Sequence, residues 1–103
     1  MLIYHLVLPE EWAAFESDLY EAESLYTEGF IHCSFASQLD DVLDRYYSDA
    51  ERVIVLEIDT DLLMSRTLNE MSTGHEIYPH VYGPINRKAI VRSFERIIEH
   101  SEV

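Results

Sequence analysis

Short apolar runs bounded by turn residues dominate this chain and predict strands. The run Leu2–Val7 is closed by Pro9, and Phe30–Cys33 follows Gly29. The strongest run is Arg52–Asp59, which is rich in β-branched residues and apolar almost throughout. Such a run is typical of a strand in the middle of a sheet, so we expect Arg52–Asp59 to have a neighbour on each side.

Three later segments extend the predicted sheet. Arg66–Met71 and Ala89–Ile98 favour strands, with a helix as the alternative for the second. Ile77–Tyr82 is also extended, but it contains Pro79, which cannot donate a backbone hydrogen bond and therefore favours a sheet edge or an irregular path. We expect the terminal residues Glu99–Val103 to fray.

Helical signals occur twice among these strands. Pro9 followed by two glutamates favours a helix start, and Trp12 and Phe15 share a face, so we predict a helix over Pro9–Asp18. The following stretch, Leu19–Glu28, has no clean period and predicts a loop or a short extended piece.

The second helical segment has the clearer signal. Apolar residues recur at the i, i+3, i+4, i+7 spacing from Leu39 to Tyr46 and predict a helix over Ala36–Tyr47. Ser34 or Ser37 is expected to cap it. We also expect one helical turn over residues 60–64. At 103 residues and 48% apolar composition, we expect a single α+β domain over residues 1–103, with two main helices and five or six strands.

Charge and composition exclude several classes of partner. The net charge is −13, so nucleic acid is not an expected partner. No apolar run approaches the roughly 20 residues that cross a bilayer, and no secretory signal is visible, so we expect a cytoplasmic protein without a membrane partner. The single cysteine, Cys33, fits a reducing compartment and is expected to be a buried, inert thiol.

One short stretch opposes this negative charge. Four of the seven basic residues fall within ten positions: Arg87, Lys88, Arg92 and Arg96. The stretch is either a solvated strand face or a small site for an anionic ligand.

Three histidines on apolar segments are the main candidates for chemistry. His5, His32 and His80 each lie in a predicted strand, and we expect them to meet around one polar pocket. Beside them, Ser34 opens the predicted helix, whose N-terminus favours an anion. For each histidine, a hydrogen-bonded structural role is the alternative.

Aromatic and acidic side chains accompany the third histidine. Tyr78 and Tyr82 lie two residues on either side of His80, so an extended chain places all three on one face, where they would stack a ring or serve as core aromatics. Glu70 and Glu76 are candidate pocket carboxylates or solvated side chains.

Several familiar motifs are missing from the sequence. No tight zinc spacing is present, so no metal ligands are assigned. With three glycines in the chain, no Walker loop or dinucleotide fingerprint fits, and the serine-hydrolase elbow is absent as well.

Several stretches together resemble the bacterial family called domain of unknown function 952. They are Ile3–His5, Glu28–Ser34, Leu56–Asp59, Leu68–Glu70 and Tyr78–Pro84. Two positions depart from the family pattern, because Cys33 stands where an aromatic or aliphatic residue is usual and Asn69 where tryptophan is common.

The resemblance implies an ADP-ribosyltransferase-like fold, a split mixed sheet with a cleft that holds NAD in the active enzymes. Tyr4-His5 and the block Gly29–Ser34 resemble two motifs of the poly-ADP-ribosyl branch. Here Leu6-Val7 replaces the usual Gly-Ser, and Ile31 or His32 replaces the usual tyrosine. Fold likeness does not by itself carry activity.

On that resemblance, residue roles follow for an active enzyme. His5 would bind a ribose hydroxyl, His32 or His80 would act as acid, base or phosphate contact, and Glu70 or Glu76 would stabilise an oxocarbenium charge. Tyr78 or Tyr82 would stack on a ring.

Three functions remain open from the sequence. The first is a domain with a histidine- and tyrosine-lined pocket that binds or processes NAD or an ADP-ribose-like nucleotide. The alternatives are a non-catalytic module for a ligand or protein, and a metal-assisted hydrolase. A glutamate placed close to His5 and His32 would favour catalysis.

Overall fold

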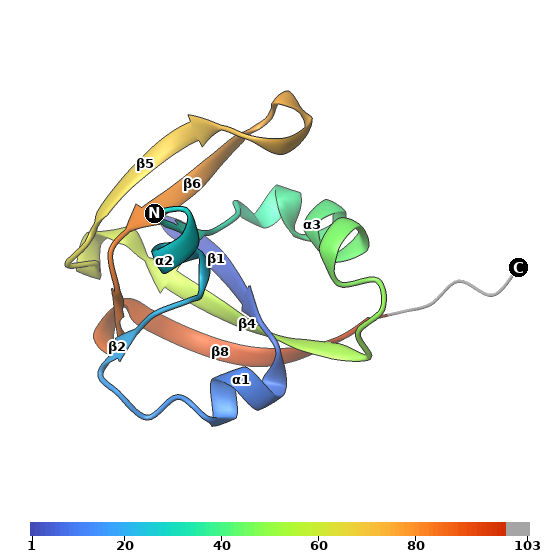
Figure 1. Ribbon diagram of the computed structural model, residues 1–103, viewed down its shortest axis with the longest axis horizontal. Coiled ribbons are helices and arrows are strands. Elements are labelled where there is room, and N and C mark those ends of the chain that lie inside the picture. The colour runs from blue at the N-terminus through green and yellow to red at the C-terminus, as the bar shows by residue number, and fades with distance from the viewer. Residues whose placement is uncertain (99–103) are drawn as a thin grey trace, which may run out of the picture.

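Two three-stranded antiparallel sheets carry the fold of residues 1–98, the part of the chain that this computed structural model describes (Figure 1). The expected frayed segment, Glu99–Val103, lies outside the described residues. The first sheet has the order β1-β4-β8 and the second β3-β6-β5, while β2 and β7 form a small third pair. The strands are β1 Leu2–Val7, β2 Leu19–Tyr20, β3 Ile31–His32, β4 Arg52–Asp59, β5 Arg66–Met71, β6 Ile77–Tyr82, β7 Ile85–Asn86 and β8 Ile90–Ile97.

Strand β4 lies in the centre of its sheet, as its apolar sequence predicts. It pairs with β1 from Val7–Ile54 to Leu2–Asp59 and with β8 on its other side. Val53, Val55 and Ile58 have no exposed surface because both faces of the strand are covered. The segment that had a helix as its alternative, β8, is a strand.

Strand β6 is also central, so the expectation that Pro79 marks an edge is wrong. The Cys33 N–H donates to the Pro79 carbonyl, so that carbonyl faces β3. In an antiparallel strand the N and C=O of one residue face the same neighbour. The proline nitrogen therefore faces the point where β3 has ended, and the pairing of β6 with β5 loses no hydrogen bond.

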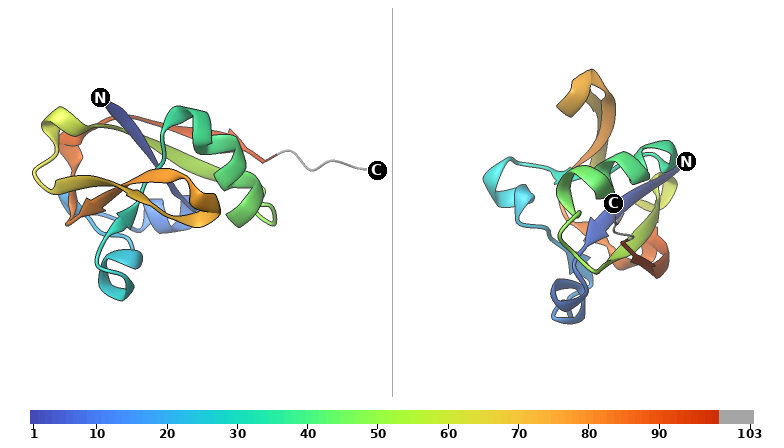
Figure 2. Two further views of the ribbon diagram at one scale, coloured as in Figure 1. Left: turned by 90° about the horizontal axis from the view of Figure 1, so that it is seen from above. Right: turned by 90° about the vertical axis from the view of Figure 1, so that its right-hand side faces the viewer.

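The sheets are split as expected, but they are not mixed. All strand pairings among residues 1–98 are antiparallel. For β5 and β6 the short turn between them explains the antiparallel pairing. The few residues from Ser72 to Glu76 suffice only for a hairpin. Figure 2 shows this hairpin standing out from the body of the fold beside the longest helix.

Only one of the two predicted helices reaches two turns. The first, α1, covers Pro9–Ala13 and not the expected Pro9–Asp18. The Arg87 side chain donates to the carbonyls of Phe15 and Ser17, which holds this stretch outside a helix. The predicted loop contains β2 and a one-turn helix, α2, Ser24–Thr27.

The second predicted helix is a 3₁₀ turn, Ala36–Gln38, followed by α3, Leu39–Tyr46. Neither serine caps it, so that expectation is wrong. The Gln38 side chain instead accepts from the Phe35 N–H at 2.9 Å and donates to the Ile77 carbonyl at 2.7 Å. Gln38 therefore joins the start of α3 to β6. Three further 3₁₀ turns cover Thr60–Leu62, Thr73–His75 and Arg87–Ala89.

Two apolar clusters form the core. The larger one joins both sheets and includes Ile3, Ile31, Ile58, Val81 and the Cys33 thiol. The smaller one packs α3 against the first sheet through Leu6, Leu39, Leu43, Val53 and Val55. Burial raises the pKa of Cys33, in agreement with the predicted inert thiol.

The three arginines of the basic stretch are paired within the protein. Arg92 lies 3.0 Å from Glu57, Arg96 pairs with Asp40, and Arg87 binds backbone carbonyls. These contacts leave the anion-site alternative without support. Among residues 1–98, no helix has the length and apolar character of a membrane span.

One pair of isoleucines tests the core. Ile31 is fully buried where the two sheets meet, while Ile97 is 71% exposed. We expect Ile31→Ala to lower the free energy of unfolding by about 2–5 kcal/mol and Ile97→Ala by less than about 0.5 kcal/mol. Urea denaturation measures both changes, and equal losses would contradict this packing.

Candidate functional site

A cleft of about 350 Å³ opens between α3, strand β1 and the β3–β6 side of the second sheet. Its walls carry several residues of the predicted site together with others that the sequence did not single out. The polar ones include Tyr4, His5, His32, Ser34, Arg45 and Tyr78. A second, more open groove shares His5 and His32 with this cleft and continues toward α2.

His5 is buried, and both of its ring nitrogens are used. Nδ1 lies 2.6 Å from the His32 carbonyl, which can only accept, so Nδ1 carries the proton. Nε2 then accepts from the Tyr20 hydroxyl at 2.9 Å. Burial lowers the pKa of His5 to about 4. His5 therefore has no nitrogen left for a ribose hydroxyl, and its role in this structure is to join β1, β2 and β3.

His32 and His80 lie opposite each other on neighbouring strands. They form a cross-strand pair, and their ring centroids are 5.5 Å apart. His32 is half exposed, and its Nε2 lies 2.8 Å from a Glu28 carboxylate oxygen. The carboxylate beside His32 is thus Glu28, which was not predicted, whereas the predicted Glu70 contacts the other ring of the pair, His80.

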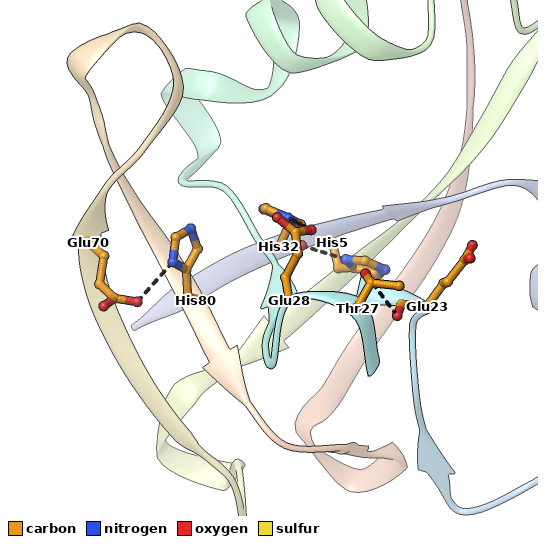
Figure 3. A network of polar contacts seen from close by, with 7 residues as sticks. All are labelled: His5, Glu23, Thr27, Glu28, His32, Glu70 and His80. Carbon is orange, nitrogen blue, oxygen red and sulfur yellow. Dashed lines mark hydrogen bonds and ion pairs between the residues drawn. The ribbon is translucent and has the colours of Figure 1, made fainter. Parts of the chain in front are cut away.

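His80 combines burial with an unused nitrogen. Its Nδ1 lies 2.9 Å from Glu70 Oε1, and its side chain is 5% exposed. Figure 3 shows this contact on one side of the ring, with the other nitrogen turned away from Glu70. That nitrogen, Nε2, is buried without a hydrogen-bond partner. The Phe30 ring stacks on His80 with centroids 4.0 Å apart.

Glu70 connects His80 with Tyr82. Its Oε1 accepts from both the Tyr82 hydroxyl and His80 Nδ1. These hydrogen bonds, the one from Tyr82 first, lower the pKa of the Glu70 carboxyl, and the bond to Glu70 raises the pKa of Tyr82. His80 and Tyr82 therefore share a face of β6, and Tyr78 lies directly opposite Glu70 in the β5–β6 pairing, which places it on the same face as predicted.

The remaining predicted residues lie at different distances from the cleft. Tyr78 is buried and lines it, and its hydroxyl donates to Glu76 at 3.2 Å. Glu76 itself is exposed and does not line the cleft. Ser34 does line it, and its backbone exchanges two hydrogen bonds with Tyr4.

The sequence missed several residues of the site, among them Tyr20, Glu28, Phe30, Arg45, Tyr46 and Tyr47. Glu28 and Phe30 belong to the block that carries the family resemblance. Their closeness to His32 in the sequence could have identified them as site residues. Arg45 and Tyr20 reach the site through tertiary packing, for which the sequence has no local sign.

Metal ligands are not assembled in the described part of the chain. No group of three His, Cys, Asp or Glu side chains in residues 1–98 lies close enough to hold a metal ion.

The buried His5 makes a pH-dependent contribution to stability. Its folded-state pKa lies below the ordinary 6.5, so between about pH 6.5 and 4 the unfolded chain binds a proton that the native protein does not. The free energy of unfolding therefore falls as pH drops through this window. His5→Gln removes this titration. We therefore expect the difference in the free energy of unfolding between wild type and variant to shrink by an amount on the order of 3 kcal/mol from pH 7 to pH 4.

Denaturant unfolding across this pH range measures the effect. The control is His75→Asn, which removes an exposed imidazole at a positive-φ position that asparagine tolerates. In His75→Asn the free energy of unfolding should depend on pH as it does in the wild type. The same pH dependence in His5→Gln would show that His5 is not held neutral.

The comparisons agree with this fold. The crystal structure of protein CC0527 from Caulobacter crescentus matches with a TM-score of 0.82 and 24% identity, over 92% of this chain and 85% of that chain. The solution NMR structure of CC0527 matches with a TM-score of 0.75 and 25% identity, over 90% of this chain and 82% of that chain. No curated protein matches.

These matches concern the fold and the family. None of the names attached to them mentions NAD or an ADP-ribosyltransferase. The family model described as "Protein of unknown function (DUF952)" matches residues 6–93. The chain therefore belongs to this family.

Proposed function

We propose that this domain binds a small nucleotide-derived ligand, with a planar ring and an anionic group, in the cleft beside α3. The observation that carries the proposal is the make-up of the cleft wall. Arg45 is the one lysine or arginine among the residues that line it, all of which lie in the described part of the chain, and four tyrosines accompany it.

Arg45 is the contact for the anion. A guanidinium binds carboxylate and phosphate oxygens through paired N–H groups. Hydrogen bonding to the Tyr78 side chain raises the pKa of Arg45, which keeps the charge in place at the cleft. On a chain with a net charge of −13, such a cation gives an anion a local site on a surface that otherwise repels it.

The tyrosines suit a planar ring. Tyr4, Tyr46, Tyr47 and Tyr78 line the cleft from β1, from the end of α3 and from β6. Aromatic rings of this kind bind other rings by offset stacking or edge contacts, and their hydroxyls keep a polar group within reach. The cleft thus offers both parts of the proposed recognition.

The volume limits the ligand. Ligand pockets span roughly 300–1,000 Å³, so about 350 Å³ is at the small end of this range. The enclosed space suits one ring with one anionic group. NAD or ADP-ribose, the ligands that the family resemblance implies, would place one half in the cleft and the other half in the open groove that adjoins it at His5 and His32.

A module that binds its ligand without converting it fits the same cleft as a domain that processes the ligand. Both would hold the anionic group through Arg45. The absence of a metal-ligand cluster among residues 1–98 leaves the metal-assisted hydrolase with no observation in its favour.

A thermal-shift screen with NAD, ADP-ribose, AMP and adenosine tests the proposal. A ligand at 100 times its dissociation constant stabilises a fold by about 2.7 kcal/mol. We expect stabilisation by the phosphate-bearing compounds and a weaker effect of adenosine. Arg45→Gln should abolish the difference between AMP and adenosine.

Lys88→Gln is the matched control because it removes one positive charge at an exposed position outside the cleft. It should respond as the wild type does. Stabilisation by none of the four compounds, or an unchanged preference for AMP in Arg45→Gln, would refute the proposal.

A further inference from the structure

We propose that His80 and His32 form a general base and general acid pair that hydrolyses a small phosphodiester bound in the cleft. The proposal rests on the proposed ligand cleft and adds a reaction to it. The two imidazoles come from facing positions on β6 and β3, with ring centroids 5.5 Å apart.

His80 has the features of the base. The Glu70 carboxylate accepts from Nδ1, which fixes the tautomer and leaves the lone pair on Nε2. That Nε2 is buried and makes no hydrogen bond. Buried polar groups are almost always bonded, so an unused acceptor at this position calls for a partner from outside the chain. A water or hydroxyl proton is such a partner.

His32 has the features of the acid. Its ring is half exposed, so solvent reaches it, and Glu28 lies 2.8 Å from its Nε2. Each imidazole of the pair thus has its own glutamate, Glu70 for His80 and Glu28 for His32 (Figure 3). Glu28 and Glu70 act as positioning residues, which hold the two rings without touching the substrate.

One member of the pair lies in the cleft with the anion contact. His32 and Arg45 both line the cleft, whereas His80 is not among its lining residues. Tyr78, which lines the cleft and interacts with Arg45, lies two residues from His80 on the same face of β6. A phosphodiester carries one negative charge, which suits a single guanidinium. Hydrolysis of this ester needs one proton removed from water and one delivered to the leaving oxygen, and two imidazoles supply both transfers.

Phe30 packs against His80. Its ring stacks on the imidazole at 4.0 Å and also contacts the rings of His32 and Tyr82. The residue before it, Gly29, has a φ of +90°, a backbone conformation that glycine adopts without strain. For substrate to reach the buried Nε2, the Phe30 ring has to move away from His80.

The reaction balances with water as the co-reactant. His80 Nε2 takes a proton from water while the water oxygen attacks phosphorus. The bond from phosphorus to the leaving oxygen breaks, and that oxygen takes a proton from the His32 imidazolium. The products are a phosphomonoester and an alcohol, and proton exchange with solvent restores both rings.

Hydrolysis of bis(p-nitrophenyl) phosphate and of a 2′,3′-cyclic nucleotide by the full chain, with a chelator present, tests the proposal. General acid and base groups each contribute typically 10²–10⁴-fold. We expect His80→Gln and His32→Gln each to lose at least about 100-fold in kcat. His75→Asn, which removes an exposed imidazole outside the cleft, should keep the wild-type rate.

The pH profile separates catalysis from a structural role. The wild type should show a bell-shaped dependence of kcat/KM, and His32→Gln should lose the limb that reports the acid. Since His80 is buried, Glu70→Gln serves as a second variant if His80→Gln does not fold. Glu70→Gln should lower kcat with little change in KM.

The outcomes distinguish this inference from the proposed function. AMP binding without hydrolysis by the wild type would overturn the inference and leave the ligand cleft intact. Hydrolysis that both histidine variants retain would do the same. Failure to bind nucleotides together with failure to hydrolyse either ester would overturn both.

Discussion

The structure depends on one buried imidazole. His5 donates to the His32 carbonyl and accepts from Tyr20, so a single side chain of β1 is bonded to both β2 and β3. A second link, the pair of backbone hydrogen bonds between Tyr4 and Ser34, lies next to it. These contacts fix where the second sheet meets the first. Burial keeps His5 neutral, which is the only form in which it both donates and accepts.

The position of the remaining histidines follows from this junction. Once β3 is bonded to β1, its pairing with β6 places His32 opposite His80. Glu70 then contacts His80 and Glu28 contacts His32. Gln38 joins the start of α3 to β6 through its bond to the Ile77 carbonyl. The cleft is therefore a consequence of the sheet junction, with Arg45 added from the end of α3.

Much of the fold was predictable because local hydrophobic patterns determine its main strands and its longest helix. The apolar run Arg52–Asp59 identified the central strand, and the heptad-like spacing from Leu39 to Tyr46 identified α3. The errors have tertiary causes. The predicted helix Pro9–Asp18 ends early because Arg87, some 70 positions away, binds the Phe15 and Ser17 carbonyls. Pro79 is tolerated in a central strand because β3 is only two residues long.

The site was predictable in part. Strand alternation placed Tyr78, His80 and Tyr82 on one face, and three histidines were expected to converge. The sequence could not distinguish their roles, because the role of each ring depends on which nitrogens are already bonded. His5 has none free, His80 has one buried and free, and His32 is half exposed. The ADP-ribosyltransferase-like fold remains an expectation of the family resemblance.

The protonation of the histidine rings tests this account most directly. Long-range ¹H–¹⁵N correlation spectra of histidine-labelled protein at pH 7 report which nitrogen of each ring carries the proton. The account predicts that His5 and His80 are both protonated at Nδ1 and unprotonated at Nε2, and that the His5 proton exchanges slowly. A His5 ring protonated at Nε2 would remove the junction between the sheets, and a His80 ring protonated at Nε2 would remove the free acceptor.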